Sequence, residues 1–300
     1  MANTLTRFLF DNRSIRGEIV QLQESFQAVL DSYHYPPAIA SLLGELMAAA
    51  SLLTATLKFK GELALQVQSE GILKYAVING THEQKLRGVA RWDESVKDIP
   101  TEFSKLFQKG ALAITLAPAD GERYQGIVAL DKDNLAACLE DYFLQSEQLL
   151  TKVYLATDLQ KDARAAGLLL QIVPQTSETV QSSDNPDFEH LSVLADTVKE
   201  DELLKLAPQT LIHRLFHEED IRLFEAQTVT FECDCSKARS ANALRNISKS
   251  ELLQIINEDG SIKMNCQFCH SEYRFDQVDV ENIHADNFKV FEDTVGKVKH

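Results

Sequence analysis

FECDCSKARS, residues 231–240, and MNCQFCHSEY, residues 264–273, together hold four of the five cysteines of the chain. They form a C-x-C motif and a C-x-x-C motif, separated by the 30 residues 236–265. Each close thiol pair can chelate from one tight turn, and two pairs supply the four ligands of a tetrahedral zinc site. The pattern predicts one bound Zn²⁺, with these ligands: Cys233, Cys235, Cys266 and Cys269.

The segment between the motifs is longer than in a usual zinc ribbon. It contains SANALRNI at 240–247 and SELLQIINEDG at 250–260, both of which predict helices. The segment between the motifs is therefore expected to form a small folded insertion. We expect a zinc-binding α+β domain over residues 232–287 and a loose tail over residues 288–300.

Composition limits the partners that this chain can have. Its 300 residues are 44% hydrophobic, enough for one large domain or two smaller ones. The net charge of −15 opposes nucleic acid and anionic membranes, which need a basic surface. The N-terminus shows no secretory signal, which predicts a cytoplasmic protein. In that reducing compartment clustered cysteines favour metal or redox chemistry over structural disulfides.

Residues 38–57, AIASLLGELMAAASLLTATL, form an apolar run that carries one charge, Glu45. Its length alone would suit a membrane span. However, serine and threonine side chains spread polarity along it, and its alanines suit close packing inside a protein. Pro36 and Pro37 precede it and suit a helix entry. We expect a buried helix that is apolar nearly all round.

The rest of the first 178 residues predicts a large α+β domain of mainly antiparallel sheets. Alternating apolar residues and turn signals mark strands within residues 61–92 and 111–130, where Asn79-Gly80 and Asp120-Gly121 are expected as hairpin turns. A helix is expected at about 133–150. KVYLATD and AGLLLQIVP, after that helix, predict a further strand pair.

A helical linker is expected over residues 179–231. Its first part belongs to a polar stretch, 175–187, without apolar periodicity. Helical spacing then begins at Phe188 and continues to Val198. Acidic residues crowd the polar sides of these helices and face only Lys199 locally, so like charges destabilise them. The linker should therefore depend on docking for its order.

Other residues support weaker alternatives. His217-Glu218-Glu219 matches the H-x-E half of a zinc deaminase signature, but Asn265 stands where its second half needs proline. A thioredoxin-like C-x-x-C would leave the other cysteine pair unused. His270 could be a fifth metal donor but is better explained as a turn histidine, and Cys138 lies on an apolar helical stripe as a core residue.

The main open question is whether the zinc is static or responds to oxidants. Zinc joins two cysteine pairs that are far apart in the chain. The disulfides most easily made on oxidation, Cys233–Cys235 and Cys266–Cys269, close very short loops and cannot replace that tie. Four nearby cations would favour the oxidisable thiolate: Lys237, Arg239, Lys263 and Arg274. Because most four-cysteine zinc sites are inert, the residues alone leave a static structural-zinc interaction module open.

The chain resembles the heat shock protein 33 family, the redox-regulated holdase chaperones of bacteria. CDC and CQFC stand at the spacing of that family, and the resemblance spans roughly residues 5–285. Further matching stretches lie in the first domain: SLLTATLKFKGELALQVQSEG, AVINGTHEQKLRGVARW, GERYQGIVAL and LAACLEDYFLQSEQL. The loop at 175–187 and the tail past 285 are too featureless to compare.

The resemblance implies a stress-response chaperone without an enzymatic active site. In its reduced state the four cysteines hold Zn²⁺ and the protein is inactive; on oxidation they form two disulfides and release the metal. The linker then unfolds with the zinc domain, and the protein dimerises and binds unfolding proteins without ATP. Candidate client-binding residues, which equally form the docking face of the linker, are Phe188, Leu191, Leu194, Leu203 and Leu204.

Overall fold

The computed structural model describes residues 3–57, 60–173 and 185–285. The chain divides into two compact units, Met1–Glu232 and Cys233–His300. The predicted boundary after residue 178, most of the polar stretch 175–187 and the predicted tail all lie outside the described residues. The described part of the predicted linker packs within the first unit.

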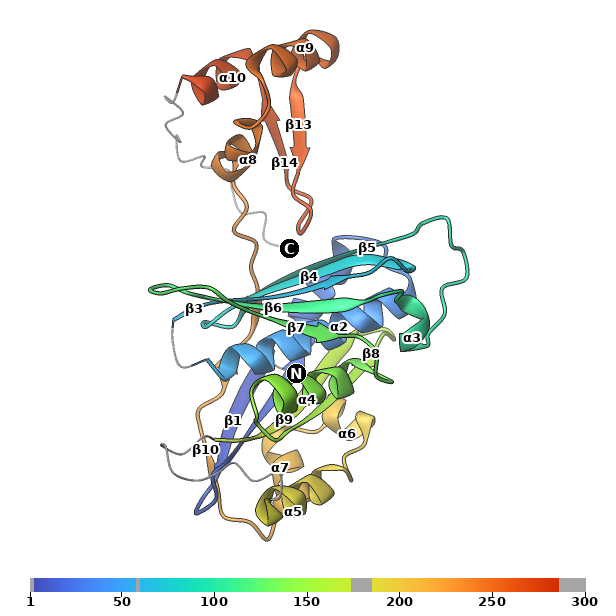
Figure 1. The fold of residues 1–300 in the computed structure, drawn as a ribbon, viewed down its shortest axis with the longest axis vertical. Helices are drawn as coiled ribbons and strands as arrows, with labels where there is room; N and C mark the ends of the chain where they lie inside the picture. Colours follow the sequence, from blue (N-terminus) through green and yellow to red (C-terminus); the bar gives the residue numbers. More distant parts are fainter. Residues whose placement is uncertain (1–2, 58–59, 174–184, 286–300) are drawn as a thin grey trace. The chain divides into compact units, whose positions relative to one another are not determined.

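The first unit contains two mainly antiparallel sheets, so the fold is α+β as predicted (Figure 1). The first sheet has the order β10-β1-β2-β9-β8, with β11 also pairing with β1. Its strands are β1 (Thr4–Phe10), β2 (Ile15–Leu22), β8 (Thr151–Asp158), β9 (Arg164–Ile172), β10 (Ile221–Leu223) and β11 (Gln227–Thr228). The second sheet has the order β12-β5-β4-β3-β6-β7. Its strands are β3 (Gly61–Gln68), β4 (Leu73–Thr81), β5 (Lys85–Trp92), β6 (Ala111–Pro118), β7 (Tyr124–Ala129) and β12 (Thr230–Phe231).

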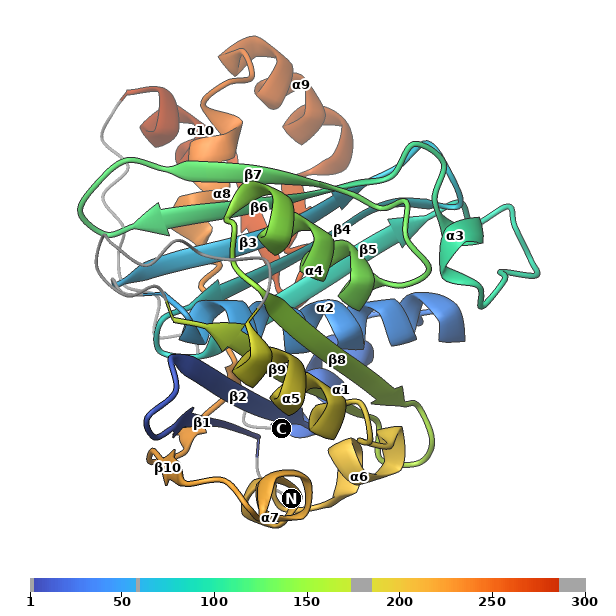
Figure 2. The same ribbon diagram turned by 60° about the horizontal axis from the view of Figure 1, so that its bottom comes forward.

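Helix α2 (Pro37–Ala55) lies between the two sheets and forms the centre of the main core (Figures 1 and 2). It is the buried helix that the sequence predicted, and Pro37 occupies its first turn. Among the described residues, α2 is the one helix that is long and apolar enough to cross a membrane. However, 83% of its most apolar window is buried inside the protein. That burial is the property of a core helix.

The remaining helices of the first unit surround this centre. They are α1 (Glu24–Asp31), α3 (Phe103–Leu106), α4 (Leu135–Ser146), α5 (Pro186–Ala195), α6 (Glu200–Lys205) and α7 (Pro208–Phe216). Helices α5, α6 and α7 cover the face of the first sheet that points away from α2 (Figure 2). The alternation of β2 explains this layering, because Val20 and Leu22 pack with α2 whereas Ile15 and Ile19 pack with the three outer helices.

One predicted turn is wrong. Asn79 and Gly80 lie inside β4, and the chain reverses after Thr81 instead. Gly80 is needed for packing, since a Cβ there would approach Thr54 Oγ1 of α2 to 3.0 Å. The Asp120-Gly121 turn is confirmed between β6 and β7, and Gly121 has φ +140°.

The second unit is a small α+β body. Its elements are α8 (Lys237–Leu244), α9 (Lys249–Asp259), β13 (Ile262–Asn265), β14 (Glu272–Phe275) and α10 (Gln277–His284). The two helices expected between the cysteine motifs are α8 and α9. Strands β13 and β14 form an antiparallel hairpin. The buried core consists of seven apolar side chains: Ala241, Leu244, Leu252, Ile262, Phe275, Val280 and Ile283.

Candidate metal centre and the docked helices

The two cysteine motifs lie on two tight backbone structures of the second unit. Cys235 directly precedes Ser236, whose hydroxyl accepts from the Arg239 amide and caps α8. Cys266 and Cys269 lie in the turn of the β13–β14 hairpin, where the His270 N–H donates to the Cys266 carbonyl at 2.9 Å. Each motif is therefore held by local backbone geometry.

The four thiols converge. Their sulfur atoms all lie within 4.8 Å of one another, and each residue is half-buried. Two sulfur pairs join the motifs: Cys233 to Cys266 at 3.6 Å and Cys235 to Cys269 at 3.3 Å. A tetrahedral Zn–S₄ site with bonds of about 2.3 Å puts its sulfurs roughly 3.8 Å apart. The four donors fit a soft tetrahedral cation such as Zn²⁺.

Two hydroxyl groups support the sulfurs from outside the cluster. Tyr273 on β14 donates to Cys235 Sγ at 3.1 Å, and the Ser271 hydroxyl lies 3.2 Å from Cys269 Sγ. Hydrogen bonds of this kind stabilise negative charge on a ligand and fix its direction. Neither residue belongs to the cysteine motifs, so sequence spacing did not reveal them; their closeness to Cys269 in the chain was the available signal.

The thiols differ in their environment when no metal is bound. Burial raises the pKa of Cys233 and, more strongly, that of Cys235. Burial also opposes ionisation of Cys269, but its hydrogen bonds with Ser271, Cys235 and Cys233 together outweigh burial and lower its pKa to about 7. The pKa of Cys269 therefore lies below those of Cys233 and Cys235.

The expected help from nearby cations is not seen. Lys237 binds Asp279 at 2.9 Å, Arg239 pairs with Asp234, and Arg274 pairs with Glu272. These charges are neutralised by carboxylates, so they do not lower the thiol pKa of Cys233 or Cys235. The electrostatic argument made from the sequence is wrong at these two positions.

Helices α5–α7 dock onto the first sheet through a dense apolar layer. Phe216 at the end of α7 contacts both Phe8 and Phe10, with ring centroids 6.1 and 5.1 Å away. The residues named from the sequence lie here: Phe188, Leu191, Leu203 and Leu204 are buried, and Leu194 is partly buried. In this state they form the docking face of the linker.

Acidic residues of the linker contact basic and hydroxyl side chains elsewhere in the first unit. These partners are far away in the sequence, so local sequence did not reveal them. Arg13, in the β1–β2 turn, pairs with Asp187 at 3.3 Å and with Glu219 at 2.8 Å. Tyr154 of β8 donates to Asp196 at 2.6 Å. The like charges are therefore partly compensated by docking.

The alternative site residues do not join the cysteine cluster. His217 is exposed, and Glu219 is bound to Arg13 and His190. Among the residues that the structure describes, one group of three or more potential metal ligands converges, and it consists of these four cysteines. His270 is an exposed turn residue with φ +57°, and Cys138 is buried in the main core.

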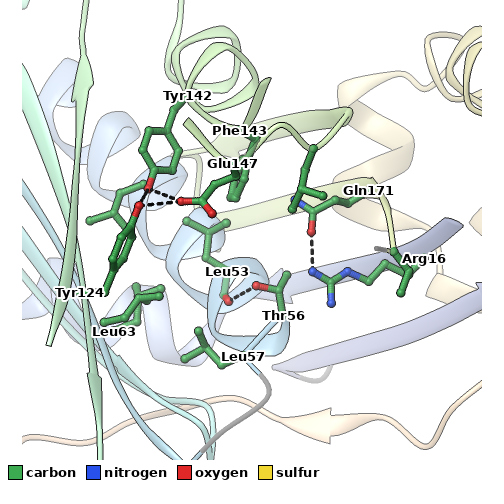
Figure 3. Close-up of a pocket in the computed structure, with 14 residues that line it drawn as sticks. Arg16, Leu53, Thr56, Leu57, Leu63, Tyr124, Tyr142, Phe143, Glu147 and Gln171 are labelled. Carbon is green, nitrogen blue, oxygen red and sulfur yellow. Dashed lines mark hydrogen bonds between the residues drawn. The ribbon is translucent and has the colours of Figure 1, made fainter. Parts of the chain in front are cut away.

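A separate cavity of about 470 Å³ lies in the first unit, between the end of α2, the second sheet and the end of α4 (Figure 3). Its wall is mostly apolar, including Leu53, Leu57 and Phe143. At one side Tyr124 and Tyr142 donate to Glu147, at 2.8 and 3.0 Å; on the other, Arg16 donates to Gln171 (Figure 3). The cavity can take an apolar group.

The fold and the cluster define a two-unit protein in which a small unit built around four converging thiols follows a larger unit with docked helices. A profile of the family described as "Hsp33 protein" matches residues 3–276. Proteins named "33 kDa chaperonin" are similar over nearly the whole chain. That of Pseudoalteromonas atlantica is 56% identical, covering 95% of this chain and 96% of its own. That of Shewanella sediminis is 52% identical, covering 94% and 95%.

A solved structure has the same fold. The 33 kDa chaperonin (heat shock protein 33 homolog) of Thermotoga maritima aligns with a TM-score of 0.79 at 20% identity, covering 95% of this chain and 98% of its own. The chain belongs to the Hsp33 family, a family of chaperones. This confirms the resemblance stated from the sequence.

Proposed function

We propose that this chain is a redox-regulated, ATP-independent holdase chaperone of the cytoplasm. In the reduced state Cys233, Cys235, Cys266 and Cys269 hold one Zn²⁺, and the protein is inactive. The observation that carries the proposal is the convergence of four sulfurs from two distant motifs within 4.8 Å. When bound, the metal supplies a long-range tie between these motifs.

Oxidation removes the tie. Each disulfide forms from two thiolates that give up two electrons, so two equivalents of hydrogen peroxide oxidise all four cysteines and are reduced to water. The local pairs Cys233–Cys235 and Cys266–Cys269 are the proposed products. Their loops are too short to restrain residues 236–265. With seven buried apolar side chains among its described residues, the second unit then lacks the energy to stay folded.

Unfolding of the second unit then destabilises the helices of the linker. Helices α5 and α6 are short, and Asp187 of α5 and Asp196 at its end depend on partners across the docking interface. When they leave, the apolar layer around Phe8, Phe10 and Leu168 is uncovered. This surface binds unfolding proteins and prevents their aggregation, and the oxidised protein dimerises. Nucleic acids and membranes are not proposed as partners, and no enzymatic turnover is proposed.

The test compares reduced and peroxide-treated protein in light scattering of a heat-denatured client, with zinc release followed in parallel by a colorimetric chelator. Suppression of scattering only after zinc release supports the redox switch. Equal scattering in both states would defeat it and leave the static structural-zinc module.

A further inference from the structure

Residues 220–232, here called the strap, connect α7 to the cysteine unit and pair with the edges of both sheets of the first unit. The strap runs antiparallel to β1, with Phe8 opposite Leu223 and Leu5 opposite Gln227. It then runs parallel to β5 through β12. The strap therefore covers the outer edge of β1 near both of its ends.

Backbone hydrogen bonds hold the strap. The Asp11 N–H donates to the Asp220 carbonyl at 2.8 Å, and the Phe224 N–H donates to the Arg7 carbonyl at 3.0 Å. Near the start of β1, the Val229 N–H donates to the Asn3 carbonyl at 2.8 Å. These bonds depend on an extended backbone and make few demands on side chains.

Side chains contribute little to this pairing. From 220 to 232 only Val229 is buried, while Leu223 and Phe224 are 45% and 44% exposed. A segment with so little apolar burial has low local stability and is ordered by what anchors its ends. One anchor is α7, through Phe216. The other is Cys233, which follows the strap directly in the chain.

Both anchors are lost together in the proposed active state, and this inference rests on that function. Without them the strap separates and leaves a row of unpaired backbone groups along β1. Such an edge pairs readily with another extended chain. Phe8 and Phe10 of the same strand are uncovered at the same time, when α7 leaves.

We propose that the outer edge of β1 is a docking site for an extended segment of an unfolding protein, and that the strap fills this site in the resting state. The segment that fits runs antiparallel to β1, with apolar side chains where Ile221 and Leu223 now lie, beside Phe10 and Phe8. Because the main contacts are backbone hydrogen bonds, the site accepts many sequences. This tolerance is what a general chaperone requires.

Hydrogen exchange on the full-length oxidised, zinc-free protein tests the inference, with reduced and carboxymethylated α-lactalbumin as a permanently unfolded probe. Amides that face the strap along β1 and just after it, such as that of Asp11, should lose protection on activation and regain it with the probe. Strap amides, such as those of Phe224 and Val229, should also lose protection on activation and should stay unprotected when the probe is added. The opposite edge of the same sheet, β8, is the internal control and should not respond to the probe.

Three results would overturn the inference: β1 amides that stay unprotected at saturating probe, strap amides that regain protection together with β1, and β1 protection that depends on protein concentration without probe. The last result would assign the edge to a second copy of the chain. If light scattering shows that the oxidised protein suppresses aggregation while the β1 amides stay unprotected with the probe, only this inference is refuted. If the oxidised protein does not suppress scattering, the proposed function falls instead.

A substitution gives a second measurement. Leu9 faces Arg222 of the strap, and Leu9→Pro removes one edge N–H without changing the β2 ladder, a change that edge strands tolerate. The oxidised variant should bind the probe roughly three- to tenfold more weakly, the range expected for one hydrogen bond. Leu155→Pro on β8 is the matched control, because this leucine is also partly buried on an outer edge. Unchanged affinity in folded Leu9→Pro contradicts the inference.

Discussion

The side-chain amide of Gln21 donates to the backbone carbonyl of Leu203 at 2.8 Å, and it also donates to the carbonyl of Leu206 at the same distance. Gln21 is a buried residue of β2, and the two carbonyls belong to the end of α6. One side chain therefore satisfies two carbonyl groups at a helix end that lies against the sheet. This contact fastens the linker to the first sheet.

Gln21→Ala should loosen the linker by about 1–3 kcal/mol, because both carbonyls lose a buried partner. The expected results are faster hydrogen exchange in α5–α7 of the reduced protein and partial suppression of client aggregation before oxidation. Gln125→Ala is the control, since Gln125 makes one exposed hydrogen bond, to Thr115. Exchange rates equal to those of the unaltered protein would show that Gln21 does not hold the linker.

Removal of the metal from the reduced protein should unfold the second unit. Zinc contributes on the order of 10–16 kcal/mol in small domains of this kind, and seven buried side chains cannot replace it. A strong chelator should reduce the helical circular dichroism and make residues within 233–285 sensitive to protease, while the first sheet and α2 stay resistant. Returning zinc under reducing conditions should restore the signal. A spectrum unaffected by the chelator would refute a folding role for the metal.

Tyr273→Phe should weaken zinc binding by about 10- to 100-fold, the usual effect of losing a hydrogen bond to a metal ligand. Competition with a fluorescent zinc chelator measures this affinity in the reduced protein. Tyr124→Phe removes a hydroxyl from the first unit and should leave zinc affinity unchanged. Equal affinities in the two variants would mean that the Tyr273 hydroxyl does not support Cys235.

Stability should depend on pH through Glu45. Burial, and secondarily the charge of Glu200, raises the pKa of Glu45 from 4.5 to about 7. The folded protein thus holds this proton more tightly than the unfolded chain does. The resulting stabilisation is present below pH 4.5 and is lost as the pH rises from 4.5 through 7. The total loss of stability above that range is about 2–3 kcal/mol.

Glu45→Gln mimics the protonated side chain and should raise the melting temperature by roughly 5 °C at pH 8, with almost no effect at pH 5. Thermal unfolding of the reduced protein at the two pH values provides the measurement. Glu62→Gln on the exposed face of β3 is the control. An equal shift of the Glu45 variant at both pH values would rule out proton linkage.

Sequence patterns predicted the elements that local chemistry determines. Helix α2 followed from a long apolar run after two prolines, and the cysteine cluster followed from motif spacing. Strands β1 and β2 were missed because β2 packs against helices on both faces and so lacks a simple alternation. The turn at Asn79-Gly80 failed because the glycine serves close packing against α2.

Contacts between residues that are far apart in the chain could not be predicted from local sequence patterns. Arg13 and Asp187 are far apart in the chain, and only the fold brings them together. The strap was not predicted as strands, because its strands are only two or three residues long and their pairing depends on edges that the two sheets of the first unit provide. The same holds for Tyr273 and Cys235, whose contact follows from the β13–β14 hairpin.

The central position of α2 bears on recovery after stress. Its side chains join the two sheets into a layer that does not use α5, α6 or α7, so losing those helices leaves a scaffold with its own interior. Under the proposed function, return to the resting state requires the outer helices to reassociate with a preformed template and does not require refolding from a denatured chain. The same molecule would then serve in more than one cycle of oxidation and reduction.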